Sequence, residues 1–174
     1  MKKPYLKIFL GFVLVFVLFI GFLYVSNDIG VPTSKLEADI RSSHRIADDW
    51  AVDGSVSDTM AAYISYPQNM SEHSFSVYVN RPGLSFGYFF YGGGSLSAIE
   101  RGIIECTVEG YMERAFISMN AQKVSQLKID DGNSIRVVDI DNSKPFAIIL
   151  PVNAGDITFL DIDGKPVEFQ KNPL

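Results

Sequence analysis

The stretch that decides the fold reads VSQLKIDDGNSIRVVDI, residues 124–140. Two runs rich in apolar and β-branched residues, Val124–Asp130 and Ser134–Ile140, flank the dipeptide Asp131-Gly132. An Asp-Gly pair readily adopts the positive φ angles that a tight turn requires. The stretch therefore predicts an antiparallel β-hairpin.

Similar runs, separated by turn residues, continue in both directions from this hairpin. They are Thr59–Tyr66, Ser74–Asn80, Leu84–Tyr91, Ile103–Glu109 and Arg114–Asn120 upstream, and Lys144–Val152, Ile157–Asp161 and Pro166–Phe169 downstream, the last two joined through Asp163-Gly164. Because no helical periodicity separates the runs, a parallel α/β fold is not expected. The pattern predicts a mainly β domain over residues 53–174, an antiparallel β-sandwich or twisted sheet of about eight or nine strands.

A helix is predicted before the strands, over Ser34–Trp50. Ser34 and Glu37 have the spacing of a capping box, and the apolar residues that follow lie near one helical face. Residues 26–52 are thus expected to form a linker and a juxtamembrane helix that packs on the domain or raises it from a membrane.

The first 25 residues are the most apolar part of the 174-residue chain, and Ile8–Val25 contains no charge. About 20 apolar residues in a helix span the hydrocarbon core of a bilayer, so residues 5–25 predict a transmembrane helix. A cleavable signal peptide is the alternative. Its apolar region is normally about 7–15 residues and ends at a small-x-small site, which Leu23–Asn27 lacks. An uncleaved signal anchor is therefore favoured.

Charge predicts the orientation of this segment. Lys2, Lys3 and Lys7 lie on its N-terminal side, Tyr5 and Tyr24 lie near its two ends, and the next charge is Asp28. By the positive-inside rule, we expect a single-pass protein of the cell membrane, with a cytoplasmic N-terminus and residues 26–174 extracytoplasmic.

Composition narrows the functions of the outer domain. Residues 26–174 hold 12 Lys and Arg and all 20 Asp and Glu residues, a net charge of −8. Such a surface repels nucleic acid, so no nucleic-acid partner is expected. The single cysteine, Cys106, excludes an internal disulfide, and low cysteine use suits a bacterial cell envelope.

Aromatic residues gather in the run Phe86–Tyr91, with more tyrosines on the two preceding runs. Under the favoured interpretation, Phe86, Tyr88 and Phe90 share one strand face and fill the core. The alternative is a platform on which sugar rings of cell-wall glycan stack, with Tyr88 and Tyr91 as ligand-binding residues.

Metal and cofactor chemistry is not predicted. The acidic pairs Asp130/Asp131, Asp139/Asp141 and Asp161/Asp163 suggest calcium ligands, but the EF-hand register fails, and solvated turns are favoured. His44 and His73 lack the spacing of metal ligands, and Asn69-Met70-Ser71 matches a glycosylation sequon.

Catalytic residues are not predicted either. Cys106 lies on the apolar side of its strand, as a structural thiol does, and Gly92-Gly93-Gly94-Ser95 lacks the lysine of a phosphate loop and suits a flexible turn. Glu105 and Glu109 share a strand face expected to be exposed, which leaves a carboxylate-dependent envelope hydrolase as the weakest hypothesis.

A resemblance adds to this interpretation. The segments Glu113–Asn120, Ile129–Ile135, Lys144–Ala147 and Leu150-Pro151 resemble short, single-pass, membrane-anchored proteins of Gram-positive bacteria that have no assigned function. The segment Phe159–Val167 also resembles the strand-turn-strand of immunoglobulin-like surface domains. The resemblance implies an outward-facing domain and supplies no catalytic residue.

We therefore expect a non-catalytic, extracytoplasmic binding or protein-interaction module, with an envelope protein of the membrane as its favoured partner. Cell-wall glycan is the alternative ligand.

Overall fold

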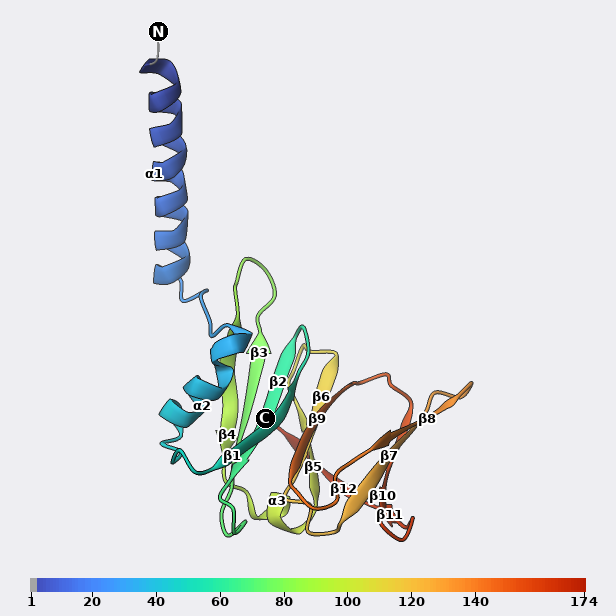
Figure 1. Cartoon of the computed structure of the whole chain (residues 1–174). Coiled ribbons are helices and arrows are strands. Elements are labelled where there is room, and N and C mark those ends of the chain that lie inside the picture. The colour runs from blue at the N-terminus through green and yellow to red at the C-terminus, as the bar shows by residue number, and fades with distance from the viewer. Residues whose placement is uncertain (1–2) are drawn as a thin grey trace.

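The computed structural model describes residues 3–174 (Figure 1). Lys2, one of the lysines behind the predicted orientation, lies outside the described residues. The side chains of residues 3–7, Tyr5 among them, and of Pro173 are outside the description as well.

Helix α1 (Lys3–Val25) extends away from the rest of the chain (Figure 1). Its window Ile8–Val25 has a mean hydropathy of 2.9, and almost all of its side chains are exposed. The helix is long and apolar enough to cross a membrane, a property that it shares with signal sequences. The rest of the domain leaves these apolar side chains uncovered.

The described strands form three four-stranded sheets. In spatial order, the first sheet contains β1 (Ala51–Val56), β2 (Met60–Tyr66), β3 (Ser74–Asn80) and β4 (Tyr88–Gly94). The second contains β12 (Phe169–Pro173), β5 (Ile103–Thr107), β6 (Glu113–Ser118) and β9 (Phe146–Pro151). The third contains β11 (Pro166–Val167), β10 (Asp156–Asp161), β7 (Val124–Asp130) and β8 (Ile135–Asp139). Paired strands are antiparallel, except that β12 runs parallel to β5. The predicted mainly β, antiparallel class is confirmed.

Both Asp-Gly hairpins are confirmed. Asp130 pairs with Ile135 across the first turn, and Leu160 pairs with Pro166 across the second. Gly132 and Gly164 have φ angles of +85° and +75°, which glycine adopts without strain.

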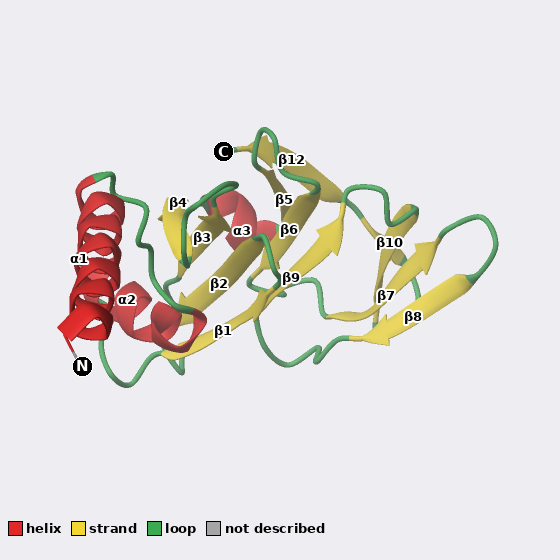
Figure 2. Ribbon diagram, turned by 90° about the horizontal axis from the view of Figure 1, so that it is seen from above, coloured by secondary structure: helices red, strands yellow, loops and turns green. Residues whose placement is uncertain are grey.

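Three hydrophobic clusters hold the layers together, and the sheets follow one another across the domain (Figure 2). The second sheet has two buried faces. Ile104 and Cys106 of β5 pack toward the first sheet, whereas Ile103 packs toward the third. The predicted half-buried strand at Ile103–Glu109 is therefore wrong, because a third sheet covers the face expected to meet water.

Aromatic packing fixes the third sheet. The ring of Phe116 is fully buried, and its centroid lies 5.2 Å from that of Phe159 and 5.1 Å from that of Phe169. The contact with Phe159 places β10 against β6, and the contact with Phe169 ties the edge strand β12 to the same cluster. Truncation of a buried phenylalanine typically costs about 3–5 kcal/mol.

The outer face of the first sheet is covered by α2 (Leu36–Ser43), which follows the short 3₁₀ helix η1 (Thr33–Lys35). Leu36 and Ile40 pack on Ala61 and Tyr78 of the sheet. The Tyr78 hydroxyl donates a 2.7 Å hydrogen bond to Asp39, and burial together with this carboxylate raises the tyrosine pKa.

The predicted helix Ser34–Trp50 is wrong in length. Helix α2 ends at Ser43, where Arg45 turns the chain with a φ angle of +54°, and the cap at Lys35 uses no side-chain hydrogen bond. Ala51–Val56 then forms β1, which pairs along its whole length with β2, so the first sheet begins before the boundary predicted at residue 53. Ala51–Val56 lies after the predicted helix and before the first predicted strand run, and its pairing with β2 makes it a strand.

The glycine run also behaves differently from the prediction. Gly92, Gly93 and Gly94 belong to β4 and pair with β3 instead of forming a turn. A Cβ atom on Gly93 would collide with the Phe75 carbonyl oxygen, so glycine permits the close approach of the two strands. Helix α3 (Ser97–Arg101) follows β4.

Strand β12 was not predicted. Its polar sequence has little strand character, and it is held at the edge of the second sheet by parallel pairing with β5.

Candidate functional site

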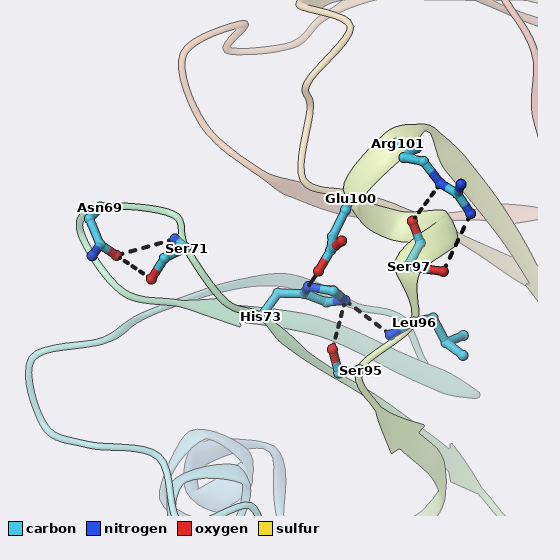
Figure 3. A network of polar contacts seen from close by, with 8 residues as sticks. All are labelled: Asn69, Ser71, His73, Ser95, Leu96, Ser97, Glu100 and Arg101. Atoms are coloured by element: carbon cyan, nitrogen blue, oxygen red, sulfur yellow. Dashed lines mark hydrogen bonds and ion pairs between the residues drawn. The ribbon is translucent and has the colours of Figure 1, made fainter.

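A buried histidine lies in a group of polar contacts beside α3 (Figure 3). His73 is 4% exposed and directly precedes β3. Its Nε2 accepts a hydrogen bond from the backbone N–H of Leu96 at 3.1 Å and lies 3.4 Å from the Ser95 hydroxyl oxygen. Its Nδ1 lies 3.5 Å from Oε1 of Glu100.

The Leu96 contact assigns the tautomer of His73. A nitrogen that accepts from a backbone N–H carries a lone pair, so in the neutral ring the proton resides on Nδ1. The Nδ1 N–H faces Glu100 but makes no hydrogen bond to any described residue. The ring thus ties the start of β3 to the segment between β4 and α3.

Ser95, His73 and Glu100 are arranged in space like a hydrolytic triad, with the imidazole between the hydroxyl and the carboxylate. However, the Nε2 lone pair is already used by Leu96, so the imidazole cannot take the Ser95 proton without losing that bond. Both contacts of the ring to the other two side chains are also longer than the about 2.6–3.2 Å of a working triad. The arrangement suits a structural connection.

A cavity of about 390 Å³ lies next to this network. Charged side chains Glu72, Glu100 and Lys123 stand on its wall. Asn120 also lines the cavity, and its side-chain amide bonds to the surrounding loops. Its nitrogen donates to three carbonyl oxygens at 3.2 Å, and its oxygen accepts from the Val124 N–H at 2.7 Å.

A larger cleft, of about 970 Å³, opens between three connections: the β1–β2 turn, the β3–β4 loop and the β5–β6 turn. These connections lie at the end of the domain from which α1 leaves (Figure 1). Asp58, Glu109 and Glu113 give the cleft carboxylates, and Arg81 gives it one cation. The Glu113 carboxylate accepts hydrogen bonds from the hydroxyls of Ser57 and Thr59, which joins the turns.

The structure separates the two predicted ligand-binding tyrosines. Tyr88 is 7% exposed, belongs to the cluster beneath α2 and donates its hydroxyl to the Ser57 carbonyl; burial raises its pKa. Tyr91 is 43% exposed. Tyr88 therefore offers no free ring face of the kind that stacks a sugar, whereas Tyr91 remains accessible.

The core interpretation of the aromatic run holds for Tyr88 but is wrong for Phe86 and Phe90, whose side chains are more than half exposed. Phe86 precedes β4, and Phe90 follows Tyr88 in regular register on the same strand face but in a part of that face that stays half exposed; the bulge opposite Val77 and Tyr78 comes only after Phe90. The Phe90 ring packs edge-on against Tyr78, with 5.5 Å between centroids.

The carboxylates of the hydrolase hypothesis do not share an exposed face. Glu105 is 3% exposed and accepts a 2.8 Å hydrogen bond from Nη1 of Arg114, whereas Glu109 is exposed in the β5–β6 turn. The predicted exposed face is wrong because the third sheet covers it. Cys106 is buried as predicted, and burial raises the pKa of its thiol to about 12.

The acidic pairs act within their own turns. Asp131 accepts from the N–H groups of Asn133 and Ser134, which lower its pKa, and Asp161 accepts from those of Asp163 and Lys165. Among residues 3–174, no group of three or more His, Cys, Asp and Glu side chains is arranged to hold a metal ion.

His44 and the sequon are also locally bonded. The two ring nitrogens of His44 lie 3.0 Å and 3.1 Å from the hydroxyls of Ser74 and Ser76 on β3. Asn69 accepts hydrogen bonds from the N–H and hydroxyl of Ser71.

One surface feature escaped the sequence analysis. All five residues of β8 are exposed, among them Ile135, Val137 and Val138. Strand β8 pairs with β7 on one side, and within the described part of the chain its other edge has no partner strand. The hairpin signal predicted the strand, but it carried no information about its place at the sheet edge.

Comparison with known proteins yields no family assignment: no family model, no curated protein and no solved structure matches this chain.

Proposed function

We propose that this chain is a non-catalytic protein-interaction module held in the cell membrane by residues 5–25, with a cytoplasmic N-terminus and residues 26–174 extracytoplasmic. The exposed apolar surface of α1, the lysines at its N-terminal side and the resemblance to membrane-anchored proteins support the anchoring. An extracytoplasmic domain tethered in this way meets proteins of the same membrane most often.

The unpaired edge of β8 is the observation that supports a protein-interaction function. Exposed edge strands are normally protected by a lysine, a proline or a bulge, because their free N–H and C=O groups recruit other strands. Ile135–Asp139 has no lysine, proline or bulge; its protection is limited to its length of five residues and the charges of Arg136 and Asp139, and it exposes three apolar side chains. An extended segment of a partner adds to this edge as a further antiparallel strand.

Charge restricts the partner further. Asp131 and Asp141 flank β8, Asp139 is its last residue, Arg136 is its one cation, and residues 26–174 carry a net charge of −8. We therefore expect an extended segment with apolar residues at alternate positions and lysine or arginine at its ends.

The test is site-specific photo-cross-linking in intact cells. A photoreactive amino acid replaces Val137, which is 52% exposed on β8, and in a matched control it replaces Ile162, 61% exposed in the β10–β11 turn of the same sheet. We expect a membrane protein to be captured through position 137 alone, and capture to be lost in Ile135→Lys. Equal adducts at both positions, or none at 137, would refute the strand addition.

A second candidate ligand is cell-wall glycan, favoured by Phe90 and Tyr91, two exposed aromatic residues that follow one another on β4. Binding to purified cell wall should fall in Tyr91→Ala. The exposed aromatic Phe86→Ala serves as a control outside this pair, and a wall-binding level unchanged by Tyr91→Ala would remove the glycan hypothesis.

A further inference from the structure

The chain between α1 and the domain is very short and rigid. Helix α1 ends at Val25, and its last turn is closed by the N–H of Asp28, which donates to the Leu23 carbonyl at 2.9 Å. Asn27 takes the left-handed conformation, with φ +56°, that typically ends a helix. Two residues therefore separate the helix from Asp28, so the Val25 and Asp28 Cα atoms are at most about 11 Å apart.

The residues that follow are fixed to the β3–β4 loop. The Phe86 N–H donates to the Asp28 carbonyl at 2.8 Å, the Gly30 N–H donates to the Phe86 carbonyl at 2.7 Å, and Val31 and Tyr88 exchange two backbone bonds of 2.8 Å. A Cβ atom on Gly30 would lie 2.6 Å from the Tyr88 carbonyl oxygen, so glycine is what permits this contact.

The β3–β4 loop consequently lies close to the end of α1. Figure 1 shows the loop rising beside β3 to the level at which α1 ends. The Arg81 guanidinium lies 3.4 Å from the Asn27 carbonyl oxygen and 4.0 Å above the Phe89 ring, which holds the base of the loop.

The tip of this loop is apolar. Leu84 is 69% exposed and Phe86 is 56% exposed, and Met112 on the adjacent β5–β6 turn is 69% exposed. Residues 80–87 contain no acidic side chain. Large apolar side chains on a loop held next to a bilayer surface gain free energy by entering the boundary between headgroups and acyl chains.

We infer that the β3–β4 loop is a second membrane contact, in which Leu84 and Phe86 insert into the outer leaflet of the bilayer that α1 crosses. This inference rests on the proposed anchoring. The carboxylates of Asp58, Glu109 and Glu113 beside the loop outnumber its one cation, Arg81, and oppose an anionic surface, so the lipid is one with a zwitterionic headgroup. Insertion would fix the tilt of the domain relative to the membrane.

The full chain, reconstituted in phosphatidylcholine vesicles, tests the inference. An environment-sensitive fluorophore is attached at Leu84→Cys and, as the control, at Ile162→Cys; the buried Cys106 thiol does not compete for the label. We expect a blue-shifted emission at position 84 that lipids with nitroxide-labelled acyl chains quench, and a water-like, unquenched emission at 162.

Vesicle flotation distinguishes a failure of the loop contact from a failure of the membrane anchoring. A chain that floats with vesicles while its position-84 probe remains water-like and unquenched overturns the loop contact and leaves the anchoring intact. A chain that does not float overturns both. If quenching persists at position 84 in Phe86→Asp, the paired insertion of Leu84 and Phe86 is wrong.

Discussion

The buried pair of Glu105 and Arg114 gives the sharpest test of the layered fold. Nη1 of Arg114 lies 2.8 Å from Oε1 of Glu105, the two side chains are 14% and 4% exposed, and the other carboxylate oxygen and Nε have no hydrogen-bond partner among the described residues. Glu105→Gln removes the negative charge and leaves the guanidinium largely buried without a counter-ion.

Loss of one partner from a buried ion pair costs about 3–5 kcal/mol. Because Arg114 keeps some access to water, we expect the lower end, about 3 kcal/mol. For a domain of this size, 1 kcal/mol corresponds to about 2–4 °C in Tm, so Glu105→Gln should lower Tm by about 6–12 °C.

Thermal unfolding of the full chain in detergent micelles, followed by circular dichroism of the β signal, measures the effect. Glu109→Gln, at an exposed position of the next turn, is the matched control and should change Tm little. The double variant Glu105→Leu with Arg114→Met should recover most of the loss, because it removes both charges. A Tm for Glu105→Gln within 1 °C of the parent would refute the assignment of this pair to the interior.

Three further predictions concern local structure. Cys106 should resist iodoacetamide at pH 8 in the folded chain and react after denaturation, since burial and a pKa of about 12 keep its thiol protonated; rapid native labelling would contradict this. Gly30→Ala should expose the segment after α1 to protease, whereas Gly102→Ala, where a Cβ meets nothing closer than 3.8 Å, should not. His73→Leu should cost about 1–3 kcal/mol in chemical denaturation, because the partly buried Leu96 N–H loses its acceptor; an unchanged midpoint would remove the structural role of the ring.

Local patterns predicted the strands well where neighbours in sequence are also partners in space. The Val124–Ile140 hairpin follows from Asp131-Gly132 and the flanking apolar runs, and the structure pairs it as expected. Ser74–Asn80 likewise forms β3 with the predicted bounds. In these cases the turn chemistry and the strand propensity favour the same conformation.

The failures occur where a distant segment changes the outcome. Ala51–Val56 has no clear strand signal of its own, yet it forms β1 because β2 offers it a complete edge. Glu105 looks like a solvent-facing residue in its own strand, and only the third sheet makes it buried. The partnerless edge of β8 is equally a property of sheet order, which periodicity does not encode.

The sequence by itself determined the apolar helix at the N-terminus, the acidic character of the remainder and the predominance of β-strands, because length, charge and alternation are properties of neighbouring residues. The tertiary structure decided which faces are buried, that Tyr88 is closed beneath α2 while Tyr91 is open, and that residues 28–31 are bonded to the β3–β4 loop. Burial and strand pairing depend on contacts between residues far apart in the chain, so they arise only when the sheets assemble.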